Sequence, residues 1–120
     1  LALAAAPAQA GEIVAWGRNP YGTVSDMPAG DDFTTIAAGP YYALALREDG
    51  SIAAWGYDFN GLVSNAPNNG VFTSLAVGQS AALALREDGS IAAWGSNHYS
   101  QVSDLPTGSD YTAVAASYVA

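Results

Sequence analysis

A unit of 39 residues recurs along this chain, and this repeat constrains the fold more than any other feature of the sequence. Repetition at a fixed period of this length is typical of an array built from one supersecondary unit. Function is therefore expected where the copies differ, because the shared positions would form the scaffold. The positions that keep the interval are Trp16, Trp55 and Trp94, Gly11, Gly50 and Gly89, Pro28, Pro67 and Pro106, and Phe33, Phe72 and Tyr111.

Within each unit the hydrophobic residues have the period of β-strands. The run ALALREDGSIAAWG occupies residues 43–56 and recurs letter for letter at 82–95, with bulky residues and alanines in alternation. Such alternation predicts strands, and two apolar faces require cover on both sides. Asp49-Gly50 and Asp88-Gly89 interrupt the run, and Asp-Gly is a strong signal for a tight hairpin turn. Alanine-rich stretches can also be helical, but glycine at about every tenth position argues against long helices.

Each unit is predicted to hold four antiparallel strands, the last of them a short outer strand that ends before a proline, since proline cannot donate to a ladder. Units of this kind, apolar on both faces and repeated about every 40 residues, are typical of β-propeller blades. We therefore predict an all-β fold of propeller blades, with complete blades at about 33–67 and 72–106 and partial blades at both ends. In the first complete blade the strands are expected near 34–38, 43–47, 51–55 and 62–64.

The repeated tryptophans are expected to pack one blade against the next. Each stands within a strand beside a glycine, which favours packing over stacking on a ligand. Burial of one such ring is worth about 4–6 kcal/mol before the opposing costs, at ~25 cal/mol/Å² over roughly 150–250 Å². The residues assigned to the repeated scaffold are Trp16, Trp55, Trp94, Gly17, Gly56, Gly95, Asp49, Gly50, Asp88 and Gly89.

The first ten residues allow two interpretations. Residues 1–10 are apolar and end in Ala8-Gln9-Ala10, the small-x-small pattern of a signal-peptidase site, so we interpret them as the tail of a signal peptide and expect a secreted or periplasmic protein. Alternatively, Leu1-Ala2-Leu3 is a decayed strand that echoes Leu44-Ala45-Leu46. Residues 11–120 are expected to form the partial propeller. Its missing blades are expected in the rest of a longer chain, and a short chain that assembles into a ring is the alternative.

The composition narrows the classes of partner. Eleven acidic residues stand against three arginines and no lysine, which gives a net charge of −8, so nucleic acids and anionic membranes are disfavoured partners. No apolar run reaches the roughly 20 residues of a membrane-spanning helix, and membrane insertion is not expected. The absence of cysteine excludes disulfides and thiolate metal sites.

Catalytic chemistry is weakly represented in the sequence. His98 is the only histidine, and no nucleophile elbow, pair of metal-spaced histidines or phosphate loop occurs, so no catalytic residue and no cofactor is predicted. Asp26, Asp31 and Asp32 could suggest calcium, but the next copy does not keep their charges. No metal site is therefore predicted.

The repeated run and the residues after it match a known motif. The matching residues are Trp16-Gly17, Asn19 and Gly22 in the first copy, Ala45-Leu46, Asp49-Gly50, Ile52, Trp55-Gly56, Asp58 and Gly61 in the second, and Asp88-Gly89, Trp94-Gly95, Asn97 and Gln101 in the third. Over residues 11–120 the sequence resembles the regulator-of-chromosome-condensation (RCC-like) repeat family, in the compact bacterial form of the secreted β-lactamase inhibitory protein of the second type. The resemblance implies a seven-bladed propeller, of which this chain would form an incomplete ring. The sequence departs from the family pattern at the usual histidine before the second strand, which is replaced by Tyr42 and Ala81.

The two rims of the predicted blades differ in character. The hairpin tip Glu48-Asp49-Gly50 recurs unchanged at 87–89, whereas the loops of the opposite rim vary between copies and are rich in aromatic residues. Loops on a rigid scaffold commonly carry function, and exposed aromatic residues suit the recognition of proteins or glycans. The alternative is that these rings only cap the blade ends. The candidate binding residues are Tyr21, Tyr41, Tyr42, Tyr57, Phe59, His98 and Tyr99.

These observations favour a non-catalytic protein-interaction module of a secreted propeller. Its expected partner is an extracellular or periplasmic protein, with an enzyme as one specific version, as in the inhibitory protein that the sequence resembles. Two other functions stay open at this point. The chain could belong to a propeller enzyme, a lyase or hydrolase whose active residues lie in other blades, or it could be an architectural module of a larger surface protein.

Overall fold

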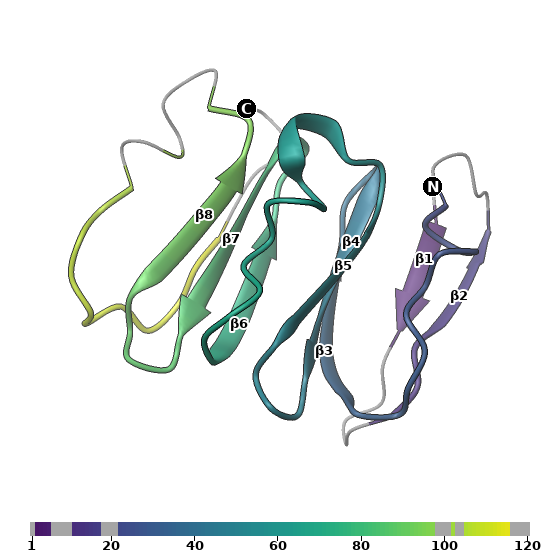
Figure 1. The fold of residues 1–120 in the computed structure, drawn as a ribbon, viewed down its shortest axis with the longest axis horizontal. Helices are drawn as coiled ribbons and strands as arrows, with labels where there is room; N and C mark the ends of the chain where they lie inside the picture. The colour runs from purple at the N-terminus through teal and green to yellow at the C-terminus, as the bar shows by residue number, and fades with distance from the viewer. Residues whose placement is uncertain (1, 6–10, 18–21, 98–101, 103–104, 116–120) are drawn as a thin grey trace.

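Three antiparallel sheets stand side by side in the computed structural model, which describes residues 2–5, 11–17, 22–97, 102 and 105–115 (Figure 1). The all-β prediction is confirmed for these residues, whose one helix is a short 3-10 turn. No helix among them is long and apolar enough to cross a membrane. The elements are β1 (Ala2–Ala5), β2 (Val14–Gly17), β3 (Phe33–Ala38), β4 (Tyr42–Arg47), β5 (Ile52–Gly56), the 3-10 helix η1 (Phe59–Gly61), β6 (Phe72–Val77), β7 (Ala81–Arg86) and β8 (Ile91–Gly95).

The chain divides into three units that follow one another in space as they do in sequence. The first unit is the β1–β2 hairpin with the turn at residues 22–27. The middle unit is the sheet β3-β4-β5 with the turn that contains η1, and the last unit begins with the sheet β6-β7-β8. In the middle unit Ala43 faces Trp55 across the strands, and in the last unit Ala82 faces Trp94. The sequence repeat is therefore also a repeat of strand register.

The Asp-Gly hairpin turns occur where the sequence predicts them. Gly50 has a φ of +82°, and its N–H donates to the carbonyl oxygen of Arg47 at 2.9 Å. A side chain at this position would strike Val71 and lie 3.1 Å from the backbone nitrogen of Phe72. Glycine is thus required here both for the turn and for the close approach of the next unit.

The prediction of an outer strand near 62–64 is wrong. Among the described residues, the sheets of the middle and last units have three strands each in place of four. After β5 the chain turns through η1, where Asn60 has a φ of +52°. The Asp58 carboxylate accepts hydrogen bonds from the N–H groups of Val63 and Ser64, each at 2.9 Å. Because a side chain satisfies these amides, they are not available to a strand ladder.

Apolar layers between the sheets form the core, and bulky residues of one unit meet small residues of the next. Leu44 and Leu46 of the middle unit are buried in one cluster with Ala82, Ala84 and Trp94 of the last unit. Such layers are the expected packing of strands that are apolar on both faces. The blade-to-blade contact predicted from the alternating pattern is therefore present at this junction.

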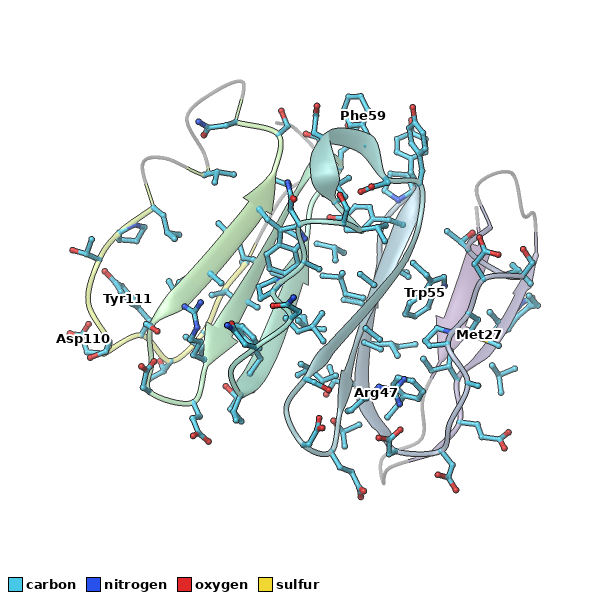
Figure 2. All side chains as sticks on the ribbon, in the orientation of Figure 1. Met27, Arg47, Trp55, Phe59, Asp110 and Tyr111 are labelled. Atoms are coloured by element: carbon cyan, nitrogen blue, oxygen red, sulfur yellow. The ribbon has the colours of Figure 1, made fainter. Side chains whose placement is uncertain are left out.

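Two of the three tryptophans join adjacent units as predicted. Trp55 and Trp94 are each only 4% exposed. The indole Nε1–H of Trp55 donates to the carbonyl oxygen of Thr23 at 2.9 Å, and that of Trp94 donates to the carbonyl oxygen of Leu62 at 2.9 Å. Figure 2 shows Trp55 between the β3–β5 sheet and the β1–β2 hairpin. Each indole therefore fills the junction with the preceding unit and satisfies its polar group there.

Trp16 does not follow this pattern, and the prediction that it packs between blades is wrong for this structure. Its side chain is 51% exposed. The turn that covers each of the other two indoles comes from the preceding unit, and Trp16 lies in the first unit. The repeat therefore predicts correctly that Trp16 lies in a strand. Burial of the indole also requires a covering turn from a neighbouring unit, as Trp55 and Trp94 have.

Residues 2–5 form a strand, which is the interpretation that the sequence left as the alternative. In β1, Ala2 faces Gly17 and Leu3 faces Trp16 of β2. Strand β1 therefore takes the place that β4 has beside β5 in the middle unit. The proposed cleavage after Ala10 concerns processing and stays a prediction; residues 1 and 6–10 lie outside the described part of the chain.

Backbone hydrogen bonds also connect each hairpin tip to the start of the next unit. In every case the carbonyl oxygen of a repeated glycine accepts the N–H of the aromatic residue that begins the following segment. These bonds fix the first strand of a unit against the tip of the unit before it. The pairs are Phe33 to Gly11 at 3.1 Å, Phe72 to Gly50 at 2.9 Å and Tyr111 to Gly89 at 3.2 Å.

Candidate functional site

Two loops of the middle unit meet at the rim opposite the hairpin tips. Tyr41 lies in the turn between β3 and β4, and Tyr57 directly follows β5. The N–H of Tyr57 donates to the carbonyl oxygen of Tyr41 at 2.8 Å. Gly56, with a φ of +107°, permits this approach, because a side chain there would lie 2.6 Å from that carbonyl oxygen. The backbone therefore holds the two tyrosines next to each other.

Tyr41, Tyr57 and Phe59 form an aromatic cluster at this rim. The rings of Tyr41 and Tyr57 pack edge to face, with centroids 6.4 Å apart at 79°, and those of Tyr57 and Phe59 stack at 5.9 Å and 24°. These are favourable geometries for aromatic pairs. Tyr57 and Phe59 are 44% and 43% exposed, and Figure 2 shows Phe59 at the edge of the molecule beside η1. The cluster is thus pre-arranged and open to solvent.

The turn that carries Phe59 is organised by Asp58. Its carboxylate accepts the N–H groups of Ser64 and Val63, and these hydrogen bonds lower the pKa of Asp58 below its ordinary value. Asp58 is therefore ionised at neutral pH and adds a negative charge within the loop that carries the cluster. The described arginines, Arg47 and Arg86, are the last residues of β4 and β7, next to the hairpin tips of the opposite rim.

The last unit has the same backbone at these positions but different side chains. Ser80 and Ser96 stand where the middle unit has Tyr41 and Tyr57, and the N–H of Ser96 donates to the carbonyl oxygen of Ser80 at 2.7 Å. The side-chain oxygen of Asn97 also accepts the N–H of Val102 at 2.9 Å, as Asp58 accepts amides in the middle unit. The loop conformation therefore does not require the aromatic rings.

Tyr42 does not belong to the binding face, and its prediction as a binding residue is corrected by its burial. The side chain is fully buried in the core. Its hydroxyl donates to the carbonyl oxygens of Gly78 at 2.9 Å and Ala81 at 3.1 Å, so it links the middle unit to the turn between β6 and β7. Of the other predicted residues, Tyr41, Tyr57 and Phe59 come together, and Tyr21, His98 and Tyr99 lie outside the described residues.

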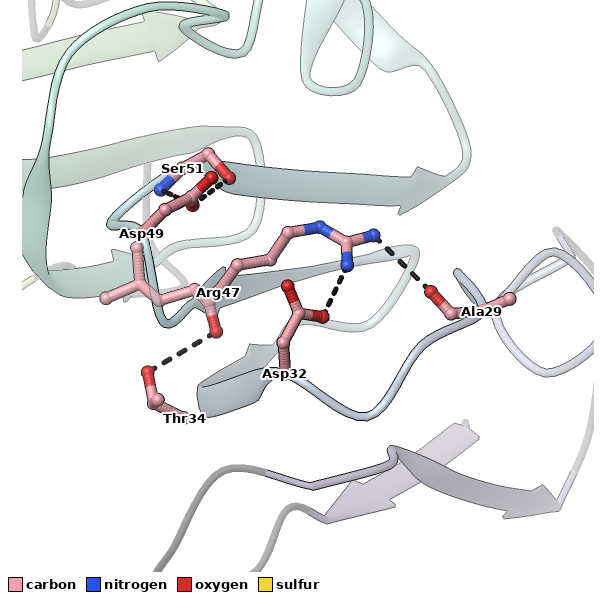
Figure 3. Close-up of polar contacts among 7 residues, drawn as sticks. Ala29, Asp32, Thr34, Arg47, Asp49 and Ser51 are labelled. Atoms are coloured by element: carbon pink, nitrogen blue, oxygen red, sulfur yellow. Dashed lines mark hydrogen bonds and ion pairs between the residues drawn. The ribbon is translucent and has the colours of Figure 1, made fainter.

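The hairpin rim is occupied by structural contacts (Figure 3). Arg47 Nη1 is 2.7 Å from Asp32 Oδ1, and its guanidinium lies 4.3 Å from the centre of the Phe33 ring. Asp32, considered above as a calcium ligand, is thus engaged by an arginine. The described residues hold no group of three or more histidines or carboxylates placed to bind a metal ion.

The two hairpin tips are expected to weaken when the pH falls. Asp49 accepts hydrogen bonds from the Oγ–H of Ser51 at 2.6 Å and its N–H at 2.9 Å, and Asp88 binds Ser90 in the same way. These bonds, from the hydroxyl first and the amide second, lower the pKa of both aspartates below 3.8. A carboxylate whose pKa is lowered in the folded state stabilises the fold at pH values above its unfolded-state pKa. This stabilisation is lost as the pH falls through its folded-state pKa.

Asp49→Asn with Asp88→Asn should therefore reduce the loss of stability between pH 7 and pH 3. Urea unfolding at the two pH values measures this difference. Glu12→Gln with Asp110→Asn removes the same charge elsewhere and serves as the control. An equal loss in the tip variant and the unmodified chain would contradict the assigned role of the two aspartates.

Solved structures with similar folds include the ectodomains of two receptor kinases and the protein Prp20p. The ectodomain of the receptor kinase CR4 from Physcomitrella patens matches 88% of this chain, with a TM-score of 0.68 and 23% identity. The CRINKLY ectodomain of the receptor kinase ACR4 from Arabidopsis thaliana matches 81%, with a TM-score of 0.63 and 26% identity. Prp20p from Saccharomyces cerevisiae, whose structure was described with its binding properties to Gsp1p and histones, matches 70%, with a TM-score of 0.57 and 23% identity.

These comparisons establish the fold and the family. The chain spans 31%, 38% and 29% of the three solved chains, and its antiparallel sheets match part of their propellers. A search of curated proteins found no match. The regulator of chromosome condensation (RCC1) repeat matches residues 29–62 and 72–101, which together make up just over half of the sequence. The chain therefore belongs to the regulator of chromosome condensation (RCC1) repeat family.

Proposed function

We propose that this chain is a non-catalytic protein-binding module of a secreted propeller and that the aromatic cluster is its contact surface. The observation that carries this proposal is the difference between units: the middle unit has Tyr41 and Tyr57 where the last unit has Ser80 and Ser96 on the same backbone. The fold does not require these rings, and Tyr57 is exposed while Tyr41 is half-buried, so together they offer a surface for recognition. Domains of this family often mediate protein binding.

The chemistry of the cluster suits a protein partner. Tyrosine and phenylalanine supply large contact areas with few rotatable bonds, so little conformational entropy is lost when they are buried. The stacked and edge-to-face ring pairs restrict the side chains further before any partner arrives. Asp58 and the net charge of −8 favour a partner surface that is neutral or basic. An extracellular or periplasmic enzyme is the specific partner that the resemblance to a secreted inhibitory protein suggests.

The secreted or periplasmic location is part of this proposal and rests on the small-x-small ending Ala8-Gln9-Ala10. Cleavage after Ala10 would remove β1 and leave β2 with the rest of the fold. Mass spectrometry of the protein recovered from outside the cytoplasm tests this step. The expected result is the mass of a polypeptide whose first residue is Gly11. Recovery of the intact N-terminus from the cytoplasm alone would contradict it.

Binding is expected to fall at least about tenfold when Tyr41 and Tyr57 are both changed to serine, because aromatic hot spots each contribute more than about 1 kcal/mol. Serine is the residue of the last unit at both positions, so the fold should be retained. Affinity capture on the full chain from the extracellular proteins of its source, followed by calorimetric titration of the purified partner, measures the effect. Val71→Ser, at an exposed position near the hairpin rim, is the control. Unchanged affinity in the double variant would refute the assigned surface.

A further inference from the structure

The hairpin rim shows how this chain holds a guanidinium group of its own. Arg47 Nη1 is 2.7 Å from Asp32 Oδ1, and the guanidinium carbon of Arg47 lies 4.3 Å from the centre of the Phe33 ring. The guanidinium of Arg86 lies over the Phe72 ring at 5.3 Å. In both cases an aromatic face holds the planar cation, and in the first a carboxylate binds it as well.

The loop at the aromatic cluster contains the same two groups, a ring and a carboxylate. Asp58 and Phe59 are adjacent in sequence, and both are exposed. The N–H groups of Ser64 and Val63 donate to one oxygen of the Asp58 carboxylate. A carboxylate has about four acceptor positions on its two oxygens, so it can accept further hydrogen bonds from a cation. Both described arginines stand next to the hairpin tips, so neither supplies a cation to this loop.

The ring stack defines where a cation would lie. The rings of Tyr57 and Phe59 stack with centroids 5.9 Å apart at 24°. A third planar group between two rings needs about 7 Å, which is twice a contact distance of roughly 3.5 Å, so a guanidinium does not fit between them. The face of Phe59 that points away from Tyr57 is the place for it. Phe59 is 43% exposed, at the edge of the molecule (Figure 2).

We propose that the aromatic cluster receives an arginine side chain of the partner protein, with its guanidinium over the outer face of Phe59 and paired with the Asp58 carboxylate. This inference rests on the proposed function and adds the chemical group that the site recognises. Arginine fits better than lysine, because its planar cation stacks on a ring and presents N–H groups to a carboxylate in a fixed fork. The net charge of −8 attracts a basic partner before contact.

Titration of the 120-residue chain with short peptides tests this recognition directly. The probes are a blocked tripeptide with arginine between two glycines, its lysine analogue, and its citrulline analogue, in which a neutral urea group replaces the guanidinium. The arginine peptide should shift the amide NMR signals of residues 57–59 and bind at least about twofold more tightly than either analogue. Equal binding of the arginine peptide and an analogue, or no shift at the cluster, would overturn the proposal.

Asp58→Asn and Phe59→Leu separate the two contacts of the guanidinium. Asparagine should keep the turn, because Asn97 accepts the N–H of Val102 in the last unit, and leucine stays apolar without an aromatic face. Each change should weaken binding of the arginine peptide about two- to fivefold, the range for exposed cation–π contacts and ion pairs. Glu48→Gln removes one exposed negative charge at the hairpin rim and is the control. A loss of equal size in the control would show attraction to net charge alone and contradict the assigned site.

The purified partner protein distinguishes a failure of this inference from a failure of the proposed function. Its affinity should fall both for Asp58→Asn and for the variant that carries Tyr41→Ser with Tyr57→Ser. If only the tyrosine variant binds more weakly, the cluster is a contact surface that holds no arginine, so this inference is wrong and the proposed function stands. If neither variant changes the affinity, the proposed function is itself refuted.

Discussion

Replacing Trp94 with alanine is expected to lower the free energy of unfolding by about 3–5 kcal/mol, the usual cost of removing a large buried aromatic side chain. The indole fills the junction between the middle and last units, and its loss would also leave the carbonyl oxygen of Leu62 without its hydrogen bond. A loss of this size is a large part of the total stability of a small domain. Urea unfolding followed by circular dichroism measures it, because that signal does not depend on tryptophan fluorescence.

The chain supplies its own matched control for this change. Trp16 occupies the same repeated position but is 51% exposed, so Trp16→Ala is expected to cost less than about 1 kcal/mol. Both variants should be compared at the same protein concentration and temperature. Equal losses in the two variants would contradict the packing role assigned to the buried indole.

Tyr42→Ala is expected to cost about as much, again roughly 3–5 kcal/mol. The tyrosine ring is fully buried, so truncation leaves a cavity between two units. Tyr42→Phe removes the hydroxyl and keeps the ring, so it measures the contribution of the hydroxyl alone. This variant should lower the free energy of unfolding by about 1–3 kcal/mol, because the carbonyl oxygens of Gly78 and Ala81 lose a buried donor. Urea unfolding of both variants gives the two losses.

The neighbouring residue is the control for Tyr42. Tyr41→Ala, in the aromatic cluster, is expected to change the free energy of unfolding by less than about 1 kcal/mol, since the last unit forms the same turn with Ser80. Its effect should be on partner binding. If Tyr41→Ala destabilised the chain as much as Tyr42→Ala, the division between core and binding surface drawn here would be wrong.

Much of the fold could be predicted from the repeat. The alternation in 43–56 defines two strands, and the Asp49-Gly50 turn is set by local backbone preferences that act within a few residues. The burial of Trp55 also follows, because the same indole recurs in every unit and two apolar faces need cover. The meeting of Tyr41 with Tyr57 was predictable as well, since loops at the same end of an antiparallel sheet lie close together.

Other features depend on interactions that the pattern does not reveal. The outer strand near 62–64 does not form because Asp58 takes the amides that its ladder would use, and the sequence does not show which acceptor those amides choose. Tyr42 and Tyr41 are adjacent tyrosines, and only the position of the next unit shows that one of them is buried. The signal that could have separated them is alternation: Tyr42 is two residues before Leu44, on the bulky face of β4.

The acceptors at the junctions have a wider consequence. Trp55 and Trp94 bind main-chain oxygens, and these belong to residues as different as Thr23 and Leu62. Because every residue has a main-chain carbonyl oxygen, this hydrogen bond does not restrict which amino acid stands at the accepting position. A unit could therefore be added to or removed from such an array in steps of 39 residues without any change in the side chains at the positions that accept the indole hydrogen bonds.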